Sequence, residues 1–70
     1  MRNGYTAVIK QQDGWYLGWI EEVPGVNCQE ATLEALKVSL REALAEALEM
    51  NRQEALSAAG DLYVEVPIAL

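Results

Sequence analysis

The side chains in this sequence that could take part in catalysis or metal binding are carboxylates and one thiol. There are eleven Asp and Glu residues and a single cysteine, Cys28, while histidine is absent. Without histidine the chain lacks the general base of Ser-His-Asp and Cys-His nucleophilic sites, and it cannot form a Cys₂His₂ or His₃ metal site. A lone cysteine cannot form an intrachain disulfide. We therefore expect Cys28 to be a small half-buried residue rather than a nucleophile.

The carboxylates could hold Mg²⁺ ions only if several of them converged. A two-metal nuclease needs acidic side chains clustered at the centres of neighbouring strands. The first strand-like segment, residues 5–10, contains none. Glu21 and Glu22 are adjacent, so an extended chain points them in opposite directions. The glutamates of residues 42–49 would share a solvated helix face. We therefore predict no enzymatic activity, no catalytic residue, no metal site and no cofactor.

The length and net charge of the chain limit its domain organisation and the partners it can bind. It has 70 residues and a formal charge of −6. This size predicts a single domain over residues 1–70, with a thin core that self-association or a partner would stabilise. The acidic charge disfavours direct binding of nucleic acids and suits a basic partner. No signal segment or membrane-spanning stretch is visible, so we expect a cytoplasmic protein without membrane contact.

Four segments have the composition and alternation of β-strands. They are residues 5–10, 15–20, 26–29 and 62–68. Asp13-Gly14, a pair favoured in tight hairpin turns, connects the first two segments. Pro24-Gly25 marks the turn before the third segment. Pro67 cannot donate to a strand ladder and restricts the last segment to a sheet edge.

A helix is predicted between the third and fourth segments, because apolar residues recur there at steps of three and four. They are Leu33, Leu36, Leu40, Ala43, Leu44, Ala47 and Leu48. Thr32 is placed to cap the helix N-terminus, and Gly60 to end the helix. The apolar stripe fails near residues 50–52. An unbroken helix over residues 33–59 would be about 40 Å long, about twice the length of a six-residue strand, so we expect a break or bend there.

The order β-β-β-α-β predicts an α+β domain, in which one long helix packs on one face of a small, mainly antiparallel sheet. The second strand is apolar on both sides, with Trp15, Leu17 and Trp19 opposite Tyr16 and Ile20. Because the helix covers only one face, one of these sets must lie outside the core, and either assignment fits the sequence. Exposed aromatic patches on small proteins usually mark contact surfaces.

The order and spacing of these features resemble the HicB-like antitoxin family. The resemblance rests on Tyr5-Thr6-Ala7-Val8-Ile9, Asp13-Gly14-Trp15-Tyr16, Glu21-Glu22-Val23-Pro24-Gly25-Val26 and Thr32-Leu33-Glu34-Ala35-Leu36, and it covers nearly the whole chain. It implies a partial ribonuclease-H-like fold without the catalytic acids of the nuclease. It also implies a protein that binds and blocks HicA, a small basic toxin that cleaves messenger RNA. An acidic inhibitor suits this role because it competes electrostatically with RNA.

The chain departs from the family pattern in two respects. Glu30 and Ala31 stand where the family usually has Gly followed by an acidic residue, so the entry to the helix is expected to differ. Many members of the family also carry a C-terminal helix-turn-helix or ribbon-helix-helix domain. A chain of 70 residues leaves no room for one, and direct DNA binding is therefore not expected.

The leading hypothesis is a stand-alone HicB-like antitoxin with partner-binding residues Trp19, Glu21, Glu22, Pro24 and Gly25. Trp19 would be an apolar anchor, and the two glutamates would pair with basic residues of the toxin. The alternative is an orphan homo-oligomeric module with no toxin partner and no catalytic activity. A homodimer or higher oligomer is expected under either hypothesis. A degenerate nuclease is a third hypothesis, which requires Mg²⁺-dependent cleavage of RNA.

Overall fold

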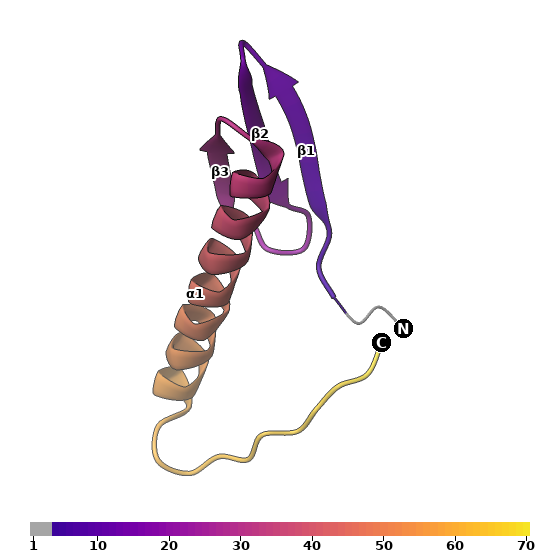
Figure 1. Cartoon of the computed structure of the whole chain (residues 1–70). Coiled ribbons are helices and arrows are strands. Elements are labelled where there is room, and N and C mark those ends of the chain that lie inside the picture. Colours follow the sequence, from indigo (N-terminus) through magenta and orange to yellow (C-terminus); the bar gives the residue numbers. More distant parts are fainter. Residues whose placement is uncertain (1–3) are drawn as a thin grey trace.

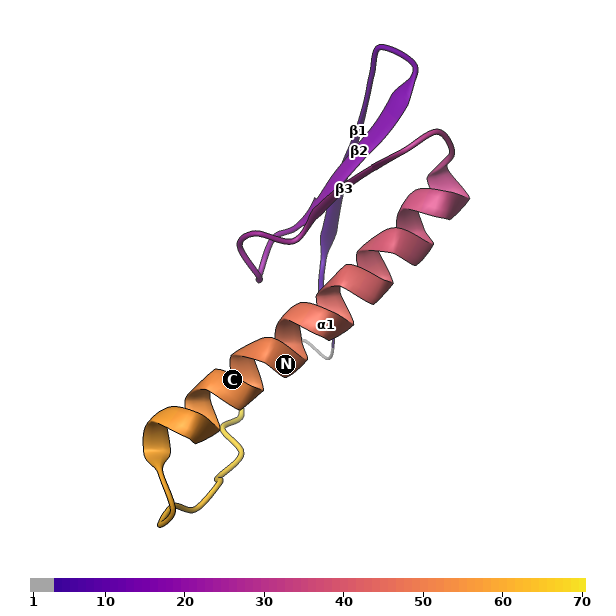
Figure 2. The ribbon, with the colours of Figure 1, turned by 90° about the vertical axis from the view of Figure 1, so that its left-hand side faces the viewer.

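The computed structural model describes residues 4–70. Its elements follow in the order β1 (Ala7–Gln12), β2 (Trp15–Ile20), β3 (Asn27–Glu30) and α1 (Leu33–Ala59). The three strands form one antiparallel sheet in the order β1-β2-β3, and α1 crosses one face of it (Figures 1 and 2). The predicted α+β class, a small antiparallel sheet with one long helix on one face, is confirmed.

The hairpin between β1 and β2 closes through Asp13 and Gly14. Both residues have positive φ, 53° and 82°, as the type I′ turn of a two-residue hairpin requires. The resulting register pairs Gln12 with Trp15 beside the turn and Ala7 with Ile20 at the other end. The sequence-based prediction of this hairpin is therefore correct.

A compact corner returns the chain from β2 to β3. It is closed by the Ile20 amide, which donates to the Val26 carbonyl at 3.2 Å, and Gly25 supplies a φ of 92°. The third strand covers Asn27–Glu30, one residue later than expected. Ser39 of α1 donates its hydroxyl to the Glu30 carboxylate at 2.6 Å, which fixes the end of β3 to the helix.

The core lies between the sheet and the first half of α1. Its buried residues are Ile20, Val23, Val26, Leu36 and Leu40. Tyr16, Gly18 and Ile20 of β2 face the helix, with Gly18 and Ile20 buried and Tyr16 packed against the core. Trp15 and Trp19 alternate with them and therefore point away from α1. Either face of β2 could pack against the helix on sequence grounds, and the structure shows that the face with Tyr16, Gly18 and Ile20 does so.

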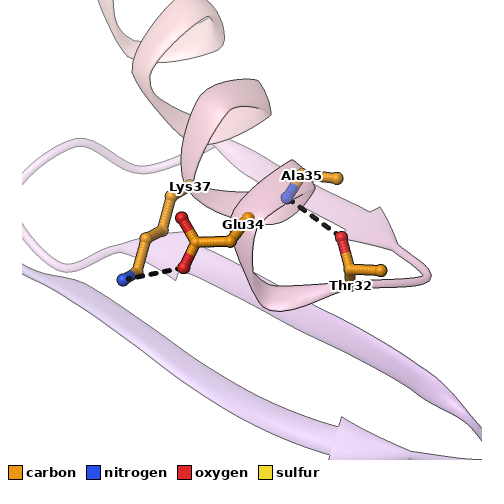
Figure 3. A network of polar contacts seen from close by, with 4 residues as sticks. All are labelled: Thr32, Glu34, Ala35 and Lys37. Atoms are coloured by element: carbon orange, nitrogen blue, oxygen red, sulfur yellow. Dashed lines mark hydrogen bonds and ion pairs between the residues drawn. The ribbon is translucent and has the colours of Figure 1, made fainter.

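Thr32 caps α1 as predicted. Its backbone is extended, with φ −131° and ψ 155°, and its hydroxyl accepts from the Ala35 amide at 3.1 Å (Figure 3). Glu34 adds negative charge to the positive end of the helix dipole and pairs with Lys37 at 3.6 Å. Gly60 ends the helix with a φ of 80°, also as predicted.

α1 is unbroken, so the break expected near residues 50–52 is wrong. The helix contains neither Gly nor Pro, the residues that most disfavour a helix interior. Its last turns extend past the sheet (Figure 2), where an apolar stripe has no strand to pack against, and the buried residues of α1 are Leu36 and Leu40 in its first half. Exposed polar contacts continue there: Glu49 accepts from Gln53 at 2.9 Å and lies 3.7 Å from Arg52.

The fourth strand expected over residues 62–68 is not formed. These residues belong to the C-terminal tail, residues 61–70, which contains neither helix nor strand. The tail leaves α1 at the end farthest from the sheet, so its first residues lie out of reach of the strands (Figure 1). The described order is therefore β-β-β-α rather than β-β-β-α-β. Within residues 4–70, no helix has the length and apolar character to cross a membrane.

Candidate partner-binding surface

The outer sheet face is the side of the sheet turned away from α1. It comprises Val8, Lys10, Gln12, Trp15, Leu17, Trp19, Asn27 and Gln29, which are directly opposite one another in the strand register or alternate along β2. Trp15 is 45% exposed and Trp19 is 41% exposed. Two indole rings on one strand thus present a large apolar surface to water, which suits a contact surface better than a free face.

Glu21 and Glu22 follow β2 directly and have different roles. The Glu21 amide donates to the Thr6 carbonyl at 2.9 Å, while the Glu22 carboxylate accepts from the Thr6 amide at 2.7 Å. Glu22 therefore ties the chain before β1 to the end of β2. Both residues are exposed. The Glu21 carboxylate is the better candidate for contact with a basic partner, because replacing Glu22 would also remove an internal hydrogen bond.

Pro24 and Gly25 lie at the corner, on the helix side of the molecule. With Val26 and Asn27 they form one wall of the corner groove, a hollow of about 340 Å³. The opposite wall belongs to α1, where Ala43, Glu46, Ala47 and Met50 line it. The groove therefore combines a carboxylate with the exposed Met50 side chain, beside the turn that the sequence singled out.

The structure does not bring all the predicted contact residues onto one face. Trp19 belongs to the outer sheet face, Pro24 and Gly25 border the corner groove on the opposite side, and Glu21 and Glu22 lie in the connection between them. A partner that contacts all of them must wrap around this end of the sheet. Of the five predicted contact residues, a flat partner seated on the outer sheet face would reach only Trp19 and Glu21.

A second groove was not foreseen from the sequence. The β1 groove, about 240 Å³, lies between β1 and α1 and is lined by Tyr5, Ala7, Ile20, Lys37, Leu40, Arg41 and Leu44. The residues of its sheet wall precede those of its helix wall by 17 positions or more (Ile20 to Lys37), so no local pattern reveals it. The one available signal was the pair Lys37 and Arg41, spaced to lie on the same side of a helix.

Some of the described side chains, the carboxylates and the thiol of Cys28, have the chemistry to bind a metal ion or to act as a nucleophile. Among residues 4–70, no three His, Cys, Asp or Glu residues are grouped as a metal ion would require. Cys28 is half-buried on the inner side of β3 and packs against the core, as expected. Burial, and then the nearby charge of Glu30, raises the pKa of the Cys28 thiol. The thiolate that a nucleophile needs is therefore disfavoured.

Comparison of the chain with known protein families, curated proteins and solved structures finds no match. The resemblance to HicB-like antitoxins rests on the sequence pattern described above. The described side chains offer an outer sheet face with two exposed indoles, an adjacent carboxylate and two grooves, all of which are features of binding surfaces.

Proposed function

We propose that the protein is a HicB-like antitoxin that neutralises a small, basic, mRNA-cleaving HicA-type toxin by protein–protein binding. It acts in the cytoplasm and uses no catalytic step, cofactor or direct contact with nucleic acid. The observation that carries the proposal is the exposure of Trp15 and Trp19 on the outer sheet face, beside the exposed Glu21.

Exposed tryptophans suit this role because their desolvation supplies much of the energy of a typical interface. Indole side chains are the commonest energetic anchors of protein–protein contacts. Trp19 lies in the middle of the sheet width, between Val8 of β1 and Asn27 of β3, so a partner that covers it also covers both neighbouring strands.

The charge of the chain suits a partner that binds RNA. A net charge of −6 accelerates encounter with a basic protein and repels phosphate backbones. An acidic protein seated on the RNA-binding surface of a toxin occupies the basic side chains that would otherwise contact phosphates. The toxin is then inhibited simply because its RNA-binding surface is occupied.

The test is calorimetric titration of this protein with the HicA-type toxin encoded beside its gene, at low and high salt. We expect tight binding that weakens as salt rises, because surface charges are screened. Trp19→Ala should weaken binding by about 30-fold or more, the effect of removing an interface anchor. Glu21→Lys should weaken binding and reduce its salt dependence. Glu54→Lys is the matched control, because it makes the same charge change on the distal part of α1.

Absence of binding, or unchanged affinity after Trp19→Ala and Glu21→Lys, would contradict the proposal. The alternative would then be an orphan homo-oligomeric module. One observation favours that alternative: the C-terminal tail exposes apolar side chains that no element of residues 4–70 covers. A short basic reading frame with a histidine-bearing toxin pattern next to the gene would favour the antitoxin instead.

A further inference from the structure

The C-terminal tail has the sequence of a strand but lacks a strand partner. Leu62, Val64, Val66 and Ile68 alternate with Tyr63, Glu65 and Pro67. An extended chain places these four aliphatic side chains on one side. They are between 67% and 94% exposed. A chain segment that is apolar on one side is stable in water only when that side is covered, so the tail needs a surface to pack against.

β1 presents a surface of the matching kind. It lies at one edge of the sheet and, among residues 4–70, pairs with β2 alone. α1 packs over β2 and β3, which leaves the inner side of β1 open and creates the β1 groove beside it. An open sheet edge next to an apolar groove can accept an added strand, because the edge supplies backbone hydrogen bonds and the groove takes alternate side chains.

Charge also favours the tail as the strand added at β1. The tail carries Asp61 and Glu65 and no basic residue. With Val64 and Val66 turned into the β1 groove, alternation places both carboxylates on the other side of the added strand, the side on which Lys10 of β1 lies. Lys37 and Arg41 line the groove itself, where the aliphatic parts of their side chains can pack against valine. The corner groove, in contrast, is lined by Glu46, which would repel the tail.

The tail of the same copy cannot fill the groove while α1 is unbroken. The groove extends along α1 from Lys37 to Leu44, and the helix continues for 15 further residues to Ala59. Those residues carry the chain about 22 Å away from the groove. An extended tail needs about seven residues to return over that distance. The return would consume residues 60–66, so the apolar stretch would end before reaching most of the β1 edge.

We propose that two copies form a dimer in which the tail of each adds as a strand to the β1 edge of the other. Val64 and Val66 of one copy enter the β1 groove of its partner. Each unit then gains the fourth strand that the sequence predicts, supplied in trans. The arrangement closes with twofold symmetry, which limits assembly to two copies. It leaves Trp15 and Trp19 uncovered, so it is independent of the proposed toxin binding.

The first test is sedimentation equilibrium of the full chain and of two variants. Val64→Lys places a positive charge on the side of the tail that enters the groove, while Tyr63→Lys places the same charge one residue away on the other side. Val64 is exposed in a single copy, so the sheet and helix should remain folded, which circular dichroism would verify. We expect Val64→Lys to raise the dimer dissociation constant about 10- to 100-fold, because a positive charge would be buried beside Lys37 and Arg41. Tyr63→Lys should raise it far less.

The second test distinguishes exchange from any other contact between copies. Ala7→Lys damages the groove, because it adds a third cation beside Lys37 and Arg41, and leaves the tail intact. Val64→Lys damages the tail and leaves the groove intact. A mixed dimer of these two variants retains one undamaged tail-to-groove contact, whereas either variant alone has none. Mixing should therefore give tighter association than either variant by itself.

Three outcomes would overturn the proposal. They are a wild-type chain that remains monomeric at all concentrations tested, a dimer with equal sensitivity to Val64→Lys and Tyr63→Lys, and a mixture that associates no more tightly than its components. Toxin binding, measured on the same variants, should be retained, so failure of the dimer and failure of the antitoxin proposal give different results.

Discussion

Gly18 of β2 lies directly beneath Leu40 of α1. A Cβ atom on Gly18 would be 2.9 Å from Leu40 Cδ1 and 3.1 Å from Leu36 Cδ2, closer than side-chain carbons normally approach. The absence of a side chain at this position therefore sets the distance between the helix and the sheet. Since Leu36 and Leu40 are the most deeply buried hydrophobic residues described, this contact is the centre of the core.

Replacement of Gly18 by valine should lower the free energy of unfolding by about 1–3 kcal/mol, because the branched side chain overpacks the helix–sheet contact. Alanine should cost less, since its smaller Cβ clash is partly offset by the reduced freedom of the unfolded chain. Urea denaturation followed by circular dichroism would measure both. Gly4→Val is the matched control, because a Cβ there meets no atom within 4 Å. Equal stability of the two valine variants would contradict the assigned packing.

Truncation of Leu36 to alanine should cost about 2–5 kcal/mol, the usual effect of a cavity in a buried core. Leu36 is 0% exposed, and a domain of this size has little stability to spare. The same denaturation experiment on Val38→Ala provides the comparison, because Val38 lies on the same helix and is 56% exposed. A loss of similar size at position 38 would mean that α1 packs through a different face.

Thr32→Ala should destabilise the protein by about 1 kcal/mol, because the Ala35 amide would lose the hydroxyl that caps the helix. Thr32→Ser keeps the hydroxyl and should retain most of the stability. Thermal unfolding of the three proteins would rank them. If the serine variant lost as much as the alanine variant, the threonine methyl group rather than its hydroxyl would be the stabilising feature.

The raised pKa of the Cys28 thiol predicts low reactivity and a defined pH dependence. At pH 8 iodoacetamide should modify the folded protein more slowly than the urea-unfolded protein, because the folded state holds less thiolate. The folded pKa lies above the unfolded one, so the contribution of the neutral thiol to stability is complete below the unfolded pKa. It is lost as the pH rises through the folded pKa. The stability difference between wild type and Cys28→Ala should follow that course, and modification at equal rates in both states would argue against a packed thiol.

Local patterns in the sequence were sufficient to predict most of the fold. The hairpin followed from the turn pair Asp13-Gly14, and α1 from the three-and-four spacing of its leucines together with Thr32 as its cap. The assignment of the two faces of β2 required the packing around Gly18, which no alternation pattern contains. The break expected near residues 50–52 assumes that a helix cannot continue beyond the sheet that covers it, whereas α1 continues there on its own backbone hydrogen bonds and exposed polar pairs.

The candidate site was predicted only in part, for a related reason. Whether Trp19 is exposed depends on which face of the sheet the helix covers. The alternation in β2 is compatible with either face, so the sequence alone does not determine the exposure of Trp19. Glu22 is a predicted contact residue that also has an internal role, and its hydrogen bond to the Thr6 amide depends on two segments that meet only in the folded chain. The β1 groove depends on the position of α1 relative to β1 and has no counterpart along the sequence.

The last turns of α1 extend past the sheet, so the two halves of this helix, one packed on the sheet and one beyond it, differ in local stability. Around Leu36, amide hydrogens are buried beneath the sheet and can exchange with solvent only when the whole domain opens. Beyond Met50, the helix has only its own hydrogen bonds and a few exposed polar pairs, so its last turns can fray without disturbing the core. Helical content would then begin to fall on heating before the core melts. In an exchanged dimer, the same distal turns would be held at both ends, and their amide exchange would slow accordingly.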